Sequence, residues 1–161
     1  LRMEYRGGLK VKSSKSKVMV FDDYAHHPTE IKATLAAFRE KWPKNALICV
    51  FQAHQAERLK RLFSAFKTAF KDANYTIILP TYKVAGRDLK EEQKFSSMAL
   101  ARAIKGKYIF DPDKELMPIL KSIILSAKSL PAGRQAPFTL VMMGAGDITK
   151  YTDKLFTKFK K

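Results

Sequence analysis

The sequence contains only one cysteine, Cys49, among its 161 residues. A single cysteine cannot form an internal disulfide, and the apolar run from Ala46 to Phe51 around it predicts a buried, unreactive thiol, which fits a reducing cytoplasm. No apolar run is long enough to cross a bilayer, and the amino terminus has no charged-then-apolar export layout. We therefore expect a cytoplasmic protein that has no membrane as partner. The sequence begins at Leu1 instead of Met, which indicates a fragment.

Common motifs of catalysis and metal binding are also missing. The chain contains no GxSxG nucleophile motif, no GxxxxGK[ST] phosphate loop and no complete GxGxxG dinucleotide motif. It has no HxxxH or CxxC spacing, so we expect no dedicated metal site. If ATP chemistry takes place at this chain, the phosphate-binding loop must come from elsewhere.

Acidic residues are few, because 15 Asp and Glu accompany 31 Lys and Arg, which gives a formal net charge of +16. Such an excess is typical of proteins that bind nucleic acids, and it also attracts anionic substrates such as nucleotides. The positive residues are spread along the chain, many of them opposite the apolar stripes of predicted helices. This distribution favours an ordinary solvated surface, and a basic nucleic-acid-binding module is kept as an alternative.

Strand and helix patterns alternate along the chain. Strands are predicted at residues 2–11, 18–21, 46–51, 75–79, 108–110 and 138–143. Helices are predicted from Pro28 to before Pro43 and at residues 57–72, 96–104, 114–127 and 147–158, with loops at 80–93 and 131–137. Such alternation predicts one α/β domain over residues 1–161, with a mostly parallel sheet, helices on both faces and a hairpin-like amino-terminal strand. The pattern does not give the strand order.

All three histidines lie in two segments that directly follow predicted strands. Residues 22–30 read DDYAHHPTE, and residues 52–58 read QAHQAER; a glycine turn, residues 144–146, follows the last strand. In an open parallel sheet, ligands bind beyond the carboxyl ends of the strands. We therefore expect the two histidine segments to emerge side by side from neighbouring strands and to form half of an anion-binding cleft.

Simpler explanations exist for the first of these segments. Asp22 and Asp23 are acids of the kind that cap loops and helices, and one of the pair can serve only that purpose. Of His26 and His27, one is expected to hold the loop through backbone hydrogen bonds while the other faces a ligand carboxylate.

The other two segments have two interpretations each. His54 and Arg58 are four residues apart near a helix start, which can direct both at one anion, or they are a satisfied histidine and a solvated arginine. The glycine turn is either only a tight strand-to-helix connection or a set of backbone amides that meets a carboxylate or phosphate.

Four segments resemble motifs of the UDP-N-acetylmuramate–L-alanine ligases of the Mur ligase family. DDYAHHPTEI at residues 22–31 is similar to a long signature of that family, and FQAHQAER at 51–58 resembles its FQPH(R/Q)xxR segment. GAGDI at 144–148 resembles its glycine turn, and RMEY at 2–5 resembles the RRFE-type strand that opens the same domain. Order and spacing agree over essentially the whole chain.

The chain departs from the family pattern at two positions and uses the rarer residue at a third. Ala53 replaces the usual proline, and Leu59 stands where the family usually has threonine. Gln55 occupies the position at which the second motif has Arg or Gln.

The resemblance implies a Rossmann-like carboxy-terminal domain that works with two further domains, one for the UDP-sugar and a central one with the ATP phosphate loop. In such ligases of peptidoglycan precursor synthesis, ATP phosphorylates the carboxylate of UDP-N-acetylmuramate, and the amine of L-alanine attacks the acyl phosphate. Mg²⁺ is held mainly by the central domain. Without its partner domains, we expect this chain to show no ligase turnover.

The resemblance also implies roles for individual residues. The nucleotide is expected to contact Arg2, Asp23 and Tyr24. Catalysis is expected to involve His26, His54 and Arg58, and substrate binding His26, Gln55, Arg58, Gly144, Ala145 and Gly146. The related murein peptide ligases, which attach a tripeptide to UDP-N-acetylmuramate, are an alternative, and Tyr24 favours the alanine enzyme.

Overall fold

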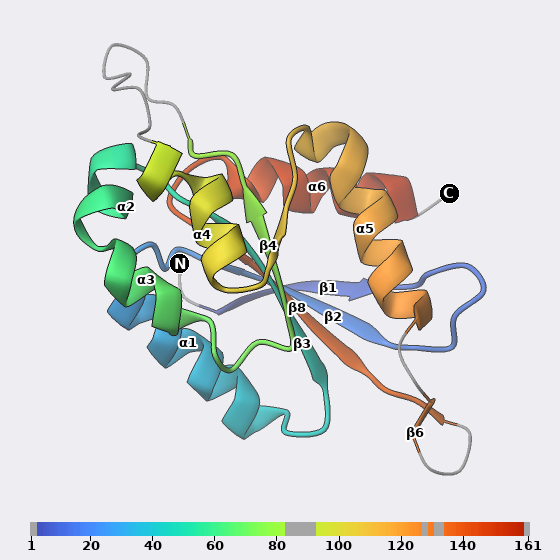
Figure 1. Ribbon diagram of the computed structural model, residues 1–161. Coiled ribbons are helices and arrows are strands. Elements are labelled where there is room, and N and C mark those ends of the chain that lie inside the picture. The colour runs from blue at the N-terminus through green and yellow to red at the C-terminus, as the bar shows by residue number, and fades with distance from the viewer. Residues whose placement is uncertain (1–2, 83–92, 127–128, 131–133, 160–161) are drawn as a thin grey trace.

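The computed structural model describes residues 3–82, 93–126, 129–130 and 134–159 (Figure 1). Within these residues the predicted alternation of strands and helices is confirmed. The strands are β1 (Glu4–Leu9), β2 (Val18–Asp23), β3 (Ala46–Gln52), β4 (Tyr75–Leu79), β5 (Lys107–Tyr108), β6 (Ser129–Leu130), β7 (Arg134–Gln135) and β8 (Phe138–Met143). The helices are α1 (Pro28–Lys41), α2 (Ala56–Arg61), α3 (Phe63–Ala69), the 3₁₀ turn η1 (Gln93–Phe95), α4 (Ser97–Ala103), α5 (Pro112–Ser126) and α6 (Ile148–Phe159).

The main sheet has six strands in the order β1-β2-β8-β3-β4-β5. β1 is antiparallel to β2, which confirms the predicted hairpin-like amino-terminal strand. The other neighbouring strands of this sheet are parallel. β8, the last strand in the chain, lies between β2 and β3. The two histidine segments therefore do not leave neighbouring strands, contrary to the sequence-based expectation. β8 is buried at all six positions, which suits a central strand covered on both faces.

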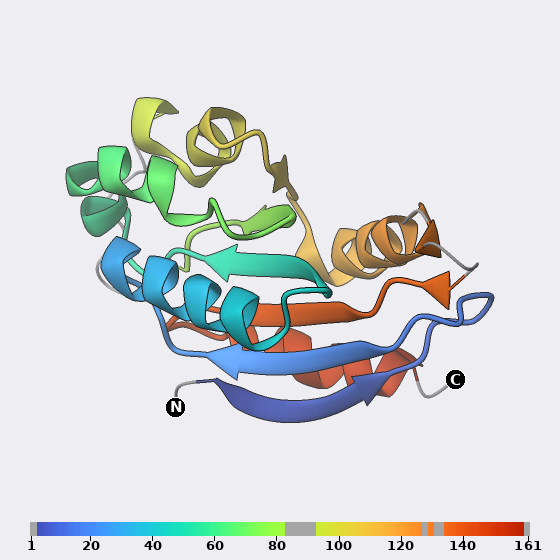
Figure 2. The same ribbon diagram turned by 90° about the horizontal axis from the view of Figure 1, so that it is seen from below.

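Helices cover both faces of this sheet (Figures 1 and 2). Alternate residues of β3 point to opposite faces: Ile48 and Val50 join the core under α5 and α6, whereas Leu47, Cys49 and Phe51 join the core under α1 to α4. The expectation of a buried thiol is confirmed, because Cys49 is fully buried and this burial raises the pKa of its thiol. The predicted three-layer α/β architecture is thus confirmed.

Several predicted elements differ from those observed. The helix predicted at 57–72 is two helices, α2 and α3, separated at Leu62, whose ψ of 17° is not helical. The break lets Leu59 stay fully buried while Phe66 and Phe70 turn onto the ring of Phe51. The loop predicted at 131–137 is partly ordered, because β6 and β7 pair with each other; residues 131–133 lie outside the described residues.

The strand predicted at residues 108–110 is shorter in the structure, where β5 covers residues 107–108. It pairs with β4 at only two positions, Ile77 and Ile78. The chain then leaves the sheet: the backbone amides of Phe110 and Asp111 donate to Glu115 and start α5. This helix begins two residues earlier than predicted, and the end predicted at residue 127 lies outside the described residues.

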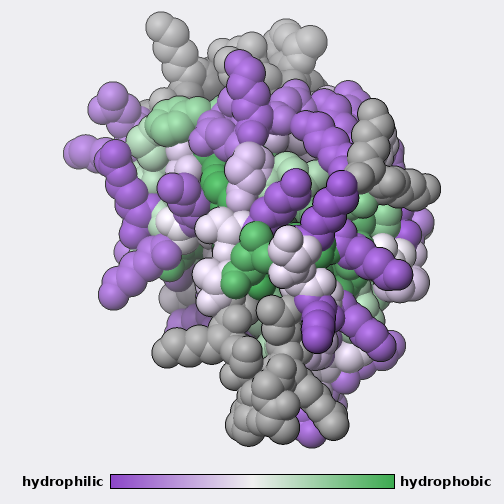
Figure 3. Space-filling view, turned by 90° about the vertical axis from the view of Figure 1, so that its right-hand side faces the viewer, coloured by the Kyte–Doolittle hydropathy of each residue, from purple (hydrophilic) through white to green (hydrophobic). Residues whose placement is uncertain are grey.

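The surface supports the interpretation of the charge as mostly solvated. Figure 3 shows the side of the molecule where the β1–β2 turn and the end of α6 lie, and hydrophilic side chains spread widely over it around limited apolar areas. Lys32, Lys60 and Lys67 are exposed on helices whose other faces are buried. No helix in the described ranges is both long and apolar enough to span a bilayer.

At the amino ends of the parallel strands, Arg39 of α1 ties three segments together. Its guanidinium donates to the carbonyl oxygens of Asn45 and Asp72 at 3.0 and 2.7 Å, and to the Asn74 side chain at 2.7 Å. The Asn74 side chain also accepts from the backbone amide of Leu47 at 2.8 Å. One planar side chain thus links α1 to the starts of β3 and β4.

We expect Arg39→Met to lower the free energy of unfolding by about 1–3 kcal/mol, because charge-assisted hydrogen bonds are lost and their acceptors are left partly buried. Lys32→Met, on the exposed face of the same helix, is the matched control and should stay within about 0.5 kcal/mol of the parent. Urea denaturation of the three proteins measures this difference. Equal stabilities would show that the hydrogen bonds of Arg39 do not stabilise the fold.

Candidate functional site at the carboxyl edge of the sheet

The register of the parallel strands brings three segments to one level. Met143, the last residue of β8, pairs with Asp23 of β2 on one side and with Phe51 of β3 on the other. The histidine segments after β2 and β3 therefore leave the sheet at the same edge, with the glycine turn after β8 between them. The backbone amide of Gly144 donates to the carbonyl oxygen of Asp23 at 3.0 Å, which fixes this turn against the end of β2.

The glycine turn also touches the end of β3, and this contact requires glycine. Gly144 has a φ of +152°, a conformation that side chains disfavour, and a Cβ atom there would lie 2.7 Å from the carbonyl oxygen of Gln52. The turn is therefore built into the surrounding backbone. The amides of Ala145 and Gly146, which are partly buried, precede α6, where a helix start favours anions.

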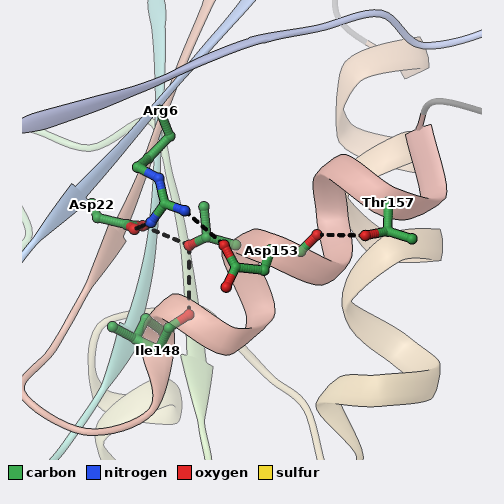
Figure 4. A network of polar contacts seen from close by, with 6 residues as sticks. Arg6, Asp22, Ile148, Asp153 and Thr157 are labelled. Atoms are coloured by element: carbon green, nitrogen blue, oxygen red, sulfur yellow. Dashed lines mark hydrogen bonds and ion pairs between the residues drawn. The ribbon is translucent and has the colours of Figure 1, made fainter.

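Asp22 and Asp23 both act inside the fold. Asp22 is buried and pairs with Arg6 of β1, and it accepts a 2.5 Å hydrogen bond from the hydroxyl of Thr152 on α6 (Figure 4). Arg6 also pairs with Asp153 at 2.6 Å. Burial raises the pKa of Asp22, while Thr152 and Arg6 act in the opposite direction. The network joins β1, β2 and α6 near the carboxyl end of β2.

Asp23, which is 2% exposed, holds the first turn of the site. Its two carboxylate oxygens accept the backbone amides of Met3 and Ala25, each at 2.8 Å. A direct contact with a nucleotide would use the remaining lone pairs of the carboxylate. The capping explanation considered for this acidic pair therefore describes Asp23, whereas Asp22 binds the side chains of Arg6 and Thr152.

His26 and His27 both contact backbone, but in different ways. The His27 ring caps α1 by accepting from the Thr29 amide at 3.4 Å, and Glu30 accepts the amides of both histidines at 3.1 and 3.2 Å, which completes a capping box. The Nδ1 atom of His26 lies 3.0 Å from the carbonyl oxygen of Tyr24, so Nδ1 is the donor. This bond leaves Nε2 of His26 for another partner.

His54 is influenced electrostatically by residues of two different segments. Burial is the largest cause that lowers its pKa, and Arg58 of α2 and His26 of the first segment lower it further. A charge on His26 acts on His54 only because the two segments lie close together at this edge. His26, His54 and Arg58 therefore lie at the same edge of the sheet, and their catalytic roles stay a prediction.

The remaining predicted site residues are placed as follows. The Tyr24 ring is 53% exposed and meets the His26 ring edge to face, with centroids 5.2 Å apart. Gln55 precedes α2 and lies partly exposed beside His54. Arg2 lies outside the described residues.

Tyr82 was missed by the sequence analysis. Its ring stacks on His54, with centroids 5.4 Å apart and planes inclined by 12°, and it also contacts Gly146. The rule that ligand-binding residues follow strand ends would have found it, because Tyr82 comes three residues after β4 ends. The sequence pattern predicts only a loop for that segment.

A cavity of about 670 Å³ lies elsewhere, between the amino end of β4 and the ends of α3, α4 and α5. Its rim includes Lys67, Lys71, Lys105 and Lys107. None of the predicted site residues lines it. Over the described ranges, no group of three or more His, Cys, Asp or Glu side chains is arranged to hold a metal ion.

A family model for the Mur ligase, glutamate ligase domain, matches residues 2–136 of the sequence. The chain belongs to this family. The match includes both histidine segments of the site and ends before the glycine turn.

Curated relatives of this Mur ligase domain extend the match. A UDP-N-acetylmuramate–L-alanine ligase of Endomicrobium trichonymphae is 32% identical over 147 residues, which is 91% of this chain and 30% of that protein. One from Desulfotalea psychrophila is 32% identical over 154 residues, 96% of this chain and 30% of that protein. The chain thus spans about a third of the length of these relatives.

Solved structures support the fold of the Mur ligase domain. A domain of a putative UDP-N-acetylmuramate:L-alanyl-gamma-D-glutamyl-meso-diaminopimelate ligase from Haemophilus ducreyi superposes with a TM-score of 0.61 at 22% identity, over 98% of this chain and 99% of that one. A UDP-N-acetylmuramate-alanine ligase from Thermotoga maritima gives 0.58 at 18% identity, over 94% of this chain and 29% of that one. At these identities the likeness concerns the fold alone.

We expect Gly144→Ala to destabilise the chain by more than about 2 kcal/mol, because backbone strain and a forced contact each cost about 1–3 kcal/mol. Gly8→Ala in β1 is the control, since a Cβ there would meet its nearest atom at an ordinary 3.7 Å. Thermal unfolding of both variants measures the effect. A Gly144→Ala protein as stable as the Gly8→Ala protein would contradict the tight packing of the turn.

We expect Arg58→Gln to raise the pKa of His54, because a positive neighbour is removed. Since the folded-state pKa of His54 is lowered, the folded chain binds fewer protons than the unfolded chain, and the contribution of His54 to stability is lost as pH falls below its ordinary value of 6.5. Arg58→Gln should reduce the stability that the chain loses through His54 at low pH. NMR titration of the imidazole measures the pKa, with Arg61→Gln on the exposed side of α2 as the control; an unchanged pKa in Arg58→Gln would refute the coupling.

Proposed function

We propose that the chain is the carboxy-terminal domain of a cytoplasmic, ATP-dependent ligase that joins L-alanine to UDP-N-acetylmuramate. The main support is the meeting of His26, His54 and Arg58 at the carboxyl edge, where the glycine turn adds backbone amides. The names of the curated relatives agree with this activity. The partner domains for the UDP-sugar and for the ATP phosphates complete the enzyme.

The chemistry of the proposed reaction suits these groups. Bound ATP supplies the phosphoryl group that activates the carboxylate of the sugar substrate. Arg58 and the imidazoles of His26 and His54 then stabilise the negative charge that develops when the amine attacks, because positioned cations and donors bind the transition state more tightly than the substrate. Burial, Arg58 and His26 lower the pKa of His54, which favours its neutral form, and a neutral imidazole can accept a proton from the attacking amine.

The proposed binding roles follow the positions of the side chains. Gln55, Gly144, Ala145 and Gly146 line the region that receives the amino acid. The exposed ring of Tyr24 packs against His26 and offers a flat surface for the nucleotide base, and Asp23 precedes it in the chain. A nucleotide contact of Arg2 is proposed from the resemblance of its segment alone. Mg²⁺ is held mainly by the central domain.

The test is an assay of the complete product of the gene that contains this chain, supplied with ATP, Mg²⁺ and UDP-N-acetylmuramate. We expect phosphate release and amide formation with L-alanine, and no turnover by the 161-residue chain alone. In the complete enzyme, Arg58→Ala should lower kcat/KM by about 100-fold or more, the usual effect of removing a group that stabilises developing charge. Arg61→Ala, an exposed arginine of the same helix, should leave it within about twofold.

Other outcomes distinguish the alternatives. Turnover with the L-alanyl-γ-D-glutamyl-diaminopimelate tripeptide but not with L-alanine would identify a murein peptide ligase. Absence of turnover with either acceptor, together with steeply salt-dependent binding to generic DNA, would identify a nucleic-acid-binding module. A gene product without an ATP phosphate loop would overturn the proposal at once.

A further inference from the structure

Tyr82 connects two parts of the carboxyl edge that come from different strands. Its ring lies nearly parallel to the His54 imidazole, and a Cβ atom added to Gly146 would lie 2.7 Å from Cγ of Tyr82. The tyrosine therefore touches both the His54 segment after β3 and the glycine turn after β8. Gly146 must be glycine for the ring to lie where it does.

The chain on the amino-terminal side of this ring is held in place. The amide of Tyr82 donates to the carbonyl oxygen of Ala53, the residue before His54, at 2.7 Å. The hydroxyl of Thr81 lies 2.6 Å from that of Ser97, which is fully buried at the start of α4. The Tyr82 ring is thus presented to His54 from a fixed backbone.

The stacking of Tyr82 on His54 has the geometry expected of a residue that positions another side chain. Stacking uses the faces of the two rings, so the nitrogen atoms at the edge of the His54 ring stay directed toward other partners. Tyr82 is half-buried and belongs to neither of the two core clusters found in the described residues. Its ring is therefore not part of the packing that holds the sheet and helices together.

We propose that Tyr82 is a positioning residue for the amino-acid end of the site: its ring fixes the plane of the His54 imidazole and supports the glycine turn at Gly146. This inference rests on the proposed function. Among the described residues, Arg58 of α2 and His26 of the first segment add to burial in lowering the pKa of His54. The Tyr82 ring covers one face of the imidazole, so it adds to the burial that keeps His54 neutral.

The first experiment needs no substrate. NMR titration follows the Hε1 signals of the three histidines in the parent chain and in Tyr82→Ala, Tyr82→Phe, Gly146→Ala and Tyr75→Ala. Tyr82→Ala and Gly146→Ala should raise the pKa of His54 toward its ordinary value, because the ring is removed or displaced. Tyr82→Phe keeps the stack and should not change it. Tyr75→Ala, at the other end of β4, is the matched control.

The second experiment measures kinetics in the complete enzyme. Tyr82→Ala should raise KM for the amino acid by about tenfold while KM for ATP stays within about twofold, and Tyr82→Phe should restore the parent values. Unchanged His54 titration in both Tyr82→Ala and Gly146→Ala, or equal losses in Tyr82→Phe and Tyr82→Ala, would overturn the proposal. If no variant or parent shows ligase turnover, the proposed function fails, whereas the titration still decides the role of Tyr82.

Discussion

The parallel pairing of β8 with both β2 and β3 is the constraint on which the candidate site depends. Met143 lies in register with Asp23 and with Phe51, so three strands end at one level. Hydrogen bonds of a parallel ladder allow little sliding, because a shift by one residue would turn every buried side chain to the other face. The segments that follow the strands are therefore brought together by the sheet itself.

The acids at the end of β2 show how the fold supports this edge. Asp22 and Asp23 are neighbours in sequence, but strand geometry points them to opposite faces. Asp22 joins Arg6 and Thr152, and so connects β2 to α6. Asp23 instead accepts two backbone amides and holds the turn that carries the histidines. A motif that reads as a functional acidic pair thus performs two separate structural tasks, and any ligand contact of Asp23 comes in addition to them.

The sequence predicted local structure well where one residue pattern decides it. β4 and β8 have the predicted bounds, and α1 begins at Pro28 because a proline fits the first turn and Glu30 completes the cap. The position of β8 was not predictable, because strand order depends on contacts between residues far apart in the chain. The break at Leu62 was missed for a similar reason. The apolar stripe over residues 57–72 fits one long helix, whereas in the structure Phe66 and Phe70 pack on Phe51 after the break. Of the candidate site, the histidine segments were recognised from their place after strands, and Tyr82 has the same kind of place after β4; only its stacking on His54 needed the folded arrangement.

The carboxylate of Glu30 accepts the amides of two consecutive residues, His26 and His27. The backbone beneath both imidazoles is thereby ordered when the domain folds, before any ligand arrives. Ordering a loop residue costs about 1–2 kcal/mol of conformational entropy, and here this cost falls on folding and not on association. A ligand that meets this edge encounters a preorganised surface, so its affinity reflects the contacts it makes more than the chain it must immobilise.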